Sequence, residues 1–138
     1  GRDVYTRAML GKDVTGAEYA AALRWNEGFQ PRLRAVFEDV DAILSPTLPF
    51  GAPKAQTGQE GEAWFNTIRE ITRFTYSWPF AGVPALSVPC GFDGNGMPLA
   101  MQIAATWLDE TTALRLGHAF QAVTDHHMRV PTAQGDSP

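Results

Sequence analysis

The chain has 138 residues, of which 44% are hydrophobic and 19% charged, and its formal net charge is −4. This composition excludes a disordered chain and a coiled-coil rod, and the length is that of one folded domain. The 11 lysines and arginines are scattered. We therefore expect binding to neither nucleic acid nor an anionic membrane surface.

Targeting signals are not visible in the sequence. No apolar run approaches the roughly 20 residues of a membrane helix, and the first residues do not read as a signal peptide. The single cysteine, Cys90, cannot form an internal disulfide, so a secreted, disulfide-stapled fold is not indicated and we expect a cytoplasmic protein. The chain lacks an initiator Met, and we expect it to begin within a longer protein or to have been trimmed.

The first predicted element is a helix over about residues 15–39. Thr15 and Glu18 have the spacing of a capping box, and apolar residues follow at helical intervals. Pro31 should kink or divide this helix, because proline lacks the backbone donor and clashes with the preceding turn.

A short strand and a second helix follow. The apolar run 41–49, stopped by Ser-Pro, predicts a brief buried strand that leads into a rigid loop. Residues 51–61, rich in glycine, predict an exposed loop. Aromatic and aliphatic residues at helical spacing predict a helix over 62–78, ended by Pro79.

The last part of the chain predicts a β-hairpin and a C-terminal helix. Residues 85–89 and 98–104 read as strands joined by an Asp-Gly-Asn-Gly turn within 91–96. Asp109 is the expected N-cap of an amphipathic helix. Helices that alternate with short strands indicate the α/β class. Three strands are too few for an independent sheet with helices on both faces, so we expect the sheet to continue in other residues.

No serine has the sequence context of a nucleophile. Ser45, Ser77, Ser87 and Ser137 lack a Gly-x-Ser-x-Gly or Gly-Gly-Ser setting. Ser45 and Ser87 fit strand-end residues whose hydroxyls bond the backbone. Cys90 fits a small buried hydrophobic residue better than a thiolate nucleophile, because no neighbouring charge lowers its pKa.

Three further features have both a structural and a functional interpretation. A metal site is the functional interpretation of His118, His126 and His127, and a solvated helix end is the simpler one. The aromatic stripe that includes Trp78 fits a core or a pocket wall. Arg7 fits either a surface residue or a bidentate partner of a substrate carboxylate.

A longer pattern covers most of the chain. Residues 81–91 read Ala-Gly-Val-Pro-Ala-Leu-Ser-Val-Pro-Cys-Gly, and residues 96–102 read Gly-Met-Pro-Leu-Ala-Met-Gln. Upstream, residues 41–53 contain Asp-x-x-x-x-Pro-Thr-x-Pro and close on Ala-Pro, and Arg7 and Gly11 fit an Arg-x-x-x-Gly pair. From Val4 to about Val130 the chain resembles the C-terminal region of the amidase signature hydrolases.

This resemblance implies an enzyme that hydrolyses carboxylic amides to acid and ammonia through a Ser–cis-Ser–Lys triad and an acyl-enzyme, with no metal or other cofactor. The triad of such enzymes lies in an earlier Gly/Ser-rich tract that this sequence does not contain. The resemblance therefore implies that residues 1–138 form one C-terminal portion of an amidase domain, inactive alone and without a catalytic residue. The implied fold is part of a mixed β-sheet sandwiched by helices, with the β-hairpin and C-terminal helix included.

The resemblance also implies partners and a substrate site. The expected partners are the remainder of the amidase domain, a small-molecule amide and a second copy in a homodimer. The expected substrate-binding residues are Arg7, which matches a carboxylate-holding position of the amidotransferase A chains in this family, Thr75, which matches the motif threonine, and Trp78.

Departures from the family pattern bear on which kind of enzyme the chain comes from. Pro79 replaces the usual Asn, and Thr72 stands where the amidotransferase members carry an Asp that meets a substrate amino group. This favours a stand-alone amidase over a fragment of an amidotransferase. A non-catalytic interaction module and a small metal-dependent hydrolase are two further hypotheses.

Overall fold

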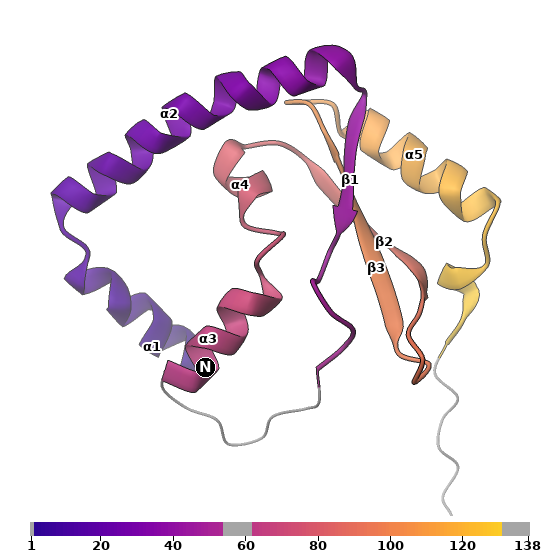
Figure 1. The fold of residues 1–138 in the computed structure, drawn as a ribbon, viewed down its shortest axis with the longest axis horizontal. Helices are drawn as coiled ribbons and strands as arrows, with labels where there is room; N and C mark the ends of the chain where they lie inside the picture. The colour runs from indigo at the N-terminus through magenta and orange to yellow at the C-terminus, as the bar shows by residue number, and fades with distance from the viewer. Residues whose placement is uncertain (1, 54–61, 131–138) are drawn as a thin grey trace, which may run out of the picture.

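The computed structural model describes residues 2–53 and 62–130. Within these ranges, helices lie on both sides of a small antiparallel sheet (Figure 1). Its elements, in chain order, are α1 (Arg2–Leu10), η1 (Gly11–Asp13), α2 (Gly16–Asp39), β1 (Ala42–Pro46), α3 (Glu62–Ile71), α4 (Ser77–Ala81), β2 (Ala85–Phe92), β3 (Pro98–Ala105), α5 (Glu110–Ala122) and η2 (His126–Met128).

The three strands have the order β1-β3-β2, so β3 lies in the middle. Leu44 of β1 and Leu86 of β2 both pair with Ile103, which fixes the register on the two sides of β3. The predicted β-hairpin is confirmed, with an irregularity between Pro89 and Gly91. At its turn, the Asp93 carboxylate accepts hydrogen bonds from two backbone N–H groups further along the turn, an arrangement typical of Asx turns.

The capping box of α2 is confirmed. The Thr15 hydroxyl accepts from the Glu18 backbone N–H at 3.2 Å, and the Glu18 carboxylate accepts from the Thr15 backbone N–H at 2.8 Å. Pro31 does not divide the helix, which runs unbroken from Gly16 to Asp39. Apolar residues on both sides of Pro31, including Phe29 and Leu33, pack into one core, and this packing holds the helix together across the missing hydrogen bond.

The helix predicted over 62–78 is two helices. α3 ends at Ile71, and the turn 72–76 separates it from α4. Pro79 lies inside the first turn of α4, where a missing N–H costs nothing, instead of ending the helix. α4 ends at Gly82, whose φ of 77° is the left-handed conformation that glycine adopts without strain.

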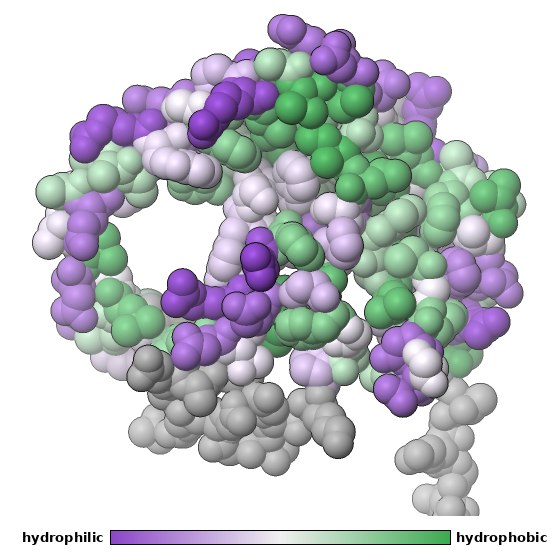
Figure 2. All heavy atoms as spheres, viewed as in Figure 1, coloured by the Kyte–Doolittle hydropathy of each residue, from purple (hydrophilic) through white to green (hydrophobic). Residues whose placement is uncertain are grey.

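The main core lies on one face of the sheet. One buried cluster contains Leu33 of α2, Trp78 and Ala81 of α4, Val83 just after α4, and Ala104 of β3. Trp107 joins this cluster to α2, because its indole N–H donates to the Ala81 carbonyl at 2.9 Å and its ring lies 4.1 Å from the Arg34 guanidinium carbon. Figure 2 shows apolar atoms gathered where α2 meets the sheet, and an opening between the first part of α2 and the segment that carries α3 and α4.

The C-terminal helix α5 covers part of the opposite face. Its N-cap is Asp109, as predicted, whose carboxylate accepts from the Thr112 backbone N–H at 3.1 Å. Gly117 lets α5 approach β2 closely, since a Cβ built there would lie 2.5 Å from the Leu86 Cδ2 atom. The predicted α/β class, with helices on both faces, is confirmed.

Much apolar surface remains uncovered on the described residues. Leu44 was expected in a buried strand, but β1 is an edge strand here and Leu44 is 61% exposed. Leu108 and Val123 are 90% and 81% exposed. Large exposed apolar patches typically mark surfaces that another part of a protein covers.

We predict that the α2 capping box makes helix stability depend on pH. Hydrogen bonds from the Thr15 backbone and hydroxyl lower the pKa of Glu18 from its ordinary value of 4.5. The stabilisation is therefore fully present above pH 4.5 and is lost as pH falls through the lowered pKa. The difference in unfolding free energy between wild type and Glu18→Gln, measured by denaturant titration at several pH values, should shrink on acidification. A pH-independent difference contradicts this prediction.

Gly117 offers a packing test. We expect Gly117→Val to lower the unfolding free energy by about 1–3 kcal/mol, because the new side chain meets Leu86 and Val88. Gly28→Val on α2 is the matched control: no atom lies within 4 Å of a Cβ there, so its effect should stay within about 0.5 kcal/mol. Equal effects of the two substitutions, measured by chemical denaturation, would show that α5 does not pack on β2 as described.

Candidate functional site

The first candidate site is an apolar groove between α2 and the segment that follows α3. It has a volume of about 580 Å³. Trp25 stacks on Phe29 with ring centroids 5.1 Å apart and lies 5.8 Å from the Phe80 ring. We call it the aromatic groove; its lining residues are Trp25, Phe29, Arg73, Tyr76, Ser77 and Phe80.

The second candidate site is a cleft of about 670 Å³ at the C-terminal end of β1. The loop after β1 forms one wall, and the β2–β3 hairpin forms the other. We call it the β1-end cleft; its lining comprises residues 44–51, Cys90 and residues 98–101.

Polar side chains connect the strands beside these clefts. The Gln102 side-chain amide, in the middle strand, donates to the Ser45 hydroxyl on β1 at 3.2 Å. The hydroxyls of Thr47 and Ser87 share a hydrogen bond of 2.8 Å. Because Ser45 and Ser87 both pair with Gln102 in register, these groups form one polar strip across the sheet.

The structure separates the predicted substrate-binding residues. Thr75 lies in the turn 72–76, and its hydroxyl donates to the Thr72 carbonyl at 3.0 Å. Trp78 lies three residues on, 9% exposed and packed in the core cluster with Leu33 and Ala104. The indole N–H of Trp78 is buried without a hydrogen-bond partner among the described residues. Arg7 belongs to α1, but its side chain lies outside the described residues.

The serines differ from the expectation of backbone bonding. Ser45 accepts from the Gln102 amide, and Ser87 pairs with the Thr47 hydroxyl, so both partners are side chains. Cross-strand neighbours in the sheet supply these partners, which the sequence alone does not reveal. Cys90 is free and only half-buried, at the irregular point of β2, and not the fully buried residue that was expected.

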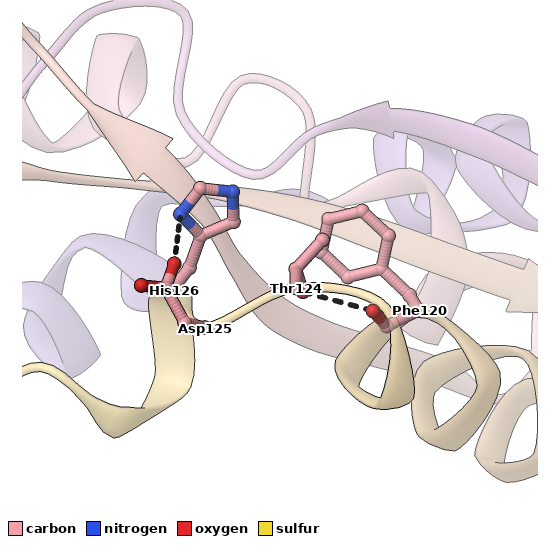
Figure 3. Close-up of polar contacts among 4 residues, drawn as sticks. All are labelled: Phe120, Thr124, Asp125 and His126. Atoms are coloured by element: carbon pink, nitrogen blue, oxygen red, sulfur yellow. Dashed lines mark hydrogen bonds and ion pairs between the residues drawn. The ribbon is translucent and has the colours of Figure 1, made fainter.

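The histidines near the end of α5 do not gather around a common point. Among the described residues, no group of three or more His, Cys, Asp or Glu side chains is placed to hold a metal ion. Figure 3 shows His126 beside Asp125, with 3.9 Å between Nδ1 and Oδ1, and the Thr124 hydroxyl donating to the Phe120 carbonyl. His126 also stacks near Phe120, with ring centroids 6.2 Å apart, as expected of a packed helix end.

The chemistry within reach of the two clefts is binding. The hydroxyls of Ser45 and Ser87 pair with Gln102 and Thr47, neither of which is a base. The carboxylates whose pKa values are lowered, Glu18 and Asp109, cap helices and line neither cleft. Within the described ranges, no helix has the length and apolarity needed to cross a membrane.

Sequence reasoning did not single out Gln102 as a site residue. It is the one polar side chain among the described residues that is buried, at 4% exposure. The available signal was its position: an amide in the middle of an apolar strand must find partners, because burial of an unpaired polar group is unfavourable.

Comparison with known proteins identifies the family. The family model described as Amidase matches residues 1–114. The A chain of the glutamyl-tRNA(Gln) amidotransferase from Lysinibacillus sphaericus is 37% identical over 136 residues, which cover 95% of this chain and 27% of that relative.

Solved structures agree with this similarity. The corresponding amidotransferase chain from Thermotoga maritima superposes with a TM-score of 0.66 at 28% identity, over 90% of this chain and 27% of that one. A chain from a vestigial protein complex connected with the origins of an s-triazine catabolic enzyme gives a TM-score of 0.74 at 26% identity, over 91% of this chain and 28% of that one. The chain thus spans about a quarter of the length of these relatives, and it belongs to the amidase family.

Proposed function

We propose that this chain is the C-terminal part of an amidase that hydrolyses carboxylic amides to acid and ammonia. The match of residues 1–114 to the amidase family carries this proposal. The reaction would proceed through the Ser–cis-Ser–Lys acyl-enzyme mechanism of the amidase signature enzymes, with all three triad residues outside this chain. The alignment with only 27% of a full-length relative supports this division, because most of the relative has no counterpart here.

In this proposal the chain supplies pocket walls and not the attacking group. The aromatic groove and the β1-end cleft offer apolar surfaces with a few polar groups, a composition typical of small-molecule sites. Arg7 and Thr75 are the proposed contacts of the acyl group. Trp78 is proposed to act from beneath, since its ring is buried in the core.

The remainder of the amidase domain is the proposed partner. The uncovered apolar residues of β1, α5 and the segment between β3 and α5 support this, since a stable domain buries such residues. Leu108 is the most exposed of them, and its φ of 61° is unfavourable for a leucine. The sheet is proposed to continue from the open edge of β1, because β2 carries Pro89, which cannot donate to a further strand.

A stand-alone amidase fits the turn 72–76 better than an amidotransferase does. Thr72 carries no carboxylate, and its hydroxyl already donates to the Ile68 carbonyl at 2.6 Å, so the turn offers nothing there to a substrate ammonium. The 37% identity to an amidotransferase chain supports the second candidate, a fragment of such an enzyme. A cytoplasmic location and a homodimer are part of the proposal, and a non-catalytic interaction module is the alternative that the uncovered surfaces favour.

The proposal predicts where activity resides. Ammonia release from simple amides should be undetectable with the 138-residue chain and serine-dependent with the full-length protein that contains it. A coupled ammonia assay on both proteins measures this. Hydrolysis by the 138-residue chain that disappears in Ser45→Ala, Ser77→Ala or Ser87→Ala would overturn the assignment of the triad to other residues.

The proposed role of Arg7 can be tested in the full-length protein. We expect Arg7→Ala to raise KM about tenfold or more for amides with a carboxylate in the acyl group, because a hydrogen bond to a charged group contributes about 1.5–3 kcal/mol. KM for neutral amides of the same size should not change. Arg2→Ala, on the same helix, is the control. Equal changes for acidic and neutral substrates count against a carboxylate contact.

A further inference from the structure

We propose that Gln102 is a positioning residue that holds the turn 72–76 against the end of β1 and so fixes the walls of both clefts. The inference rests on the proposed function, because it concerns the shape of the proposed substrate site. Gln102 lines neither cleft, and it acts through the segments that it binds.

The hydrogen bonds of Gln102 converge from distant parts of the chain. Its side-chain nitrogen donates to the Phe74 carbonyl at 2.8 Å, the Pro46 carbonyl at 3.1 Å and the Ser45 hydroxyl at 3.2 Å. An amide group has two N–H donors, so the two longer bonds share one hydrogen and the bond to Phe74 has its own. Phe74 lies 28 residues from Gln102 in sequence, and Pro46 lies 56.

The bond to Phe74 explains the break between α3 and α4. In a continuous helix the Phe74 carbonyl would accept from the Trp78 backbone N–H. Here it accepts from Gln102, and the Thr72 and Thr75 hydroxyls donate to the carbonyls of Ile68 and Thr72. Among side-chain hydrogen bonds between described residues, the bond from Gln102 is the one that ties this turn to the sheet.

The two segments that Gln102 joins border different clefts. Arg73 and Tyr76 flank Phe74 and line the aromatic groove. Ser45 and Pro46 line the β1-end cleft. One amide therefore sets the distance between the two walls, and its burial at 4% exposure protects the bonds from competition with water. Its removal leaves two backbone carbonyls without this donor, and the turn loses its attachment.

The test uses Gln102→Met in the full-length protein, since methionine has nearly the same length but no donor. Hydrogen–deuterium exchange of the turn should become at least tenfold faster, because the Thr75 and Tyr76 N–H groups both donate to the Thr72 carbonyl inside the turn. KM for amide substrates should rise about tenfold while kcat changes less than threefold. Thr124→Val is the matched control, as it removes one half-buried bond from a side chain to a carbonyl outside both clefts.

The readouts separate this proposal from the proposed function. A full-length protein that hydrolyses no amide overturns the function, while exchange at the turn still decides whether Gln102 holds it. Unchanged exchange, or unchanged KM in an active enzyme, overturns the positioning role. If Gln102→Met does not fold, NMR of the wild type decides: protected side-chain amide hydrogens of Gln102 are the expected result, and free exchange with solvent refutes the proposal.

Discussion

The burial of β3 and of its one polar side chain is the constraint on which the other elements depend. β3 is paired on both edges, and helices lie over both faces. Ala104 and Ala105 are fully buried and small, which lets α4 and Trp107 come close to the sheet. Gln102 lies in the same strand and must be satisfied there, so the chain brings the end of β1 and the turn 72–76 to it.

The same packing explains why the described residues form an incomplete structure. The core cluster holds α2 and α4 on one face of the sheet, and α5 covers β2 and β3 on the other. β1 keeps an open edge, and Leu44 and Leu108 remain largely exposed. A chain that aligns with 27% of a full-length relative and leaves such surfaces open is consistent with a domain whose sheet and core extend into other residues.

The candidate site combines apolar walls with a polar connection beneath them. Trp25, Phe29 and Phe80 give the aromatic groove its shape, and hydrogen bonds from Asn26 and Gln30 to the carbonyls of Phe80 and Ala81 hold α2 against α4. This rigidity suits a binding surface, because side chains fixed by packing lose little further entropy when a ligand binds. Membership of the amidase family then accounts for a chain whose clefts bind without an attacking group of their own.

The sequence by itself determined the local structure and the family. The capping box of Thr15 and Glu18, the N-cap at Asp109 and the hairpin turn depend on contacts between near neighbours, which spacing reveals. The motif from Ala81 to Gln102 was specific enough to indicate the amidase family before any coordinates.

Only the tertiary structure decided the features that depend on distant partners. The end of α3 at Ile71 depends on the Gln102 amide reaching the Phe74 carbonyl, and the unbroken α2 depends on packing on both sides of Pro31. The burial of Trp78 under α2 separates it from Thr75, although the two lie three residues apart. Hydrogen bonding and packing across tens of residues decided these points, and the periodicity of a sequence does not record which distant groups will meet.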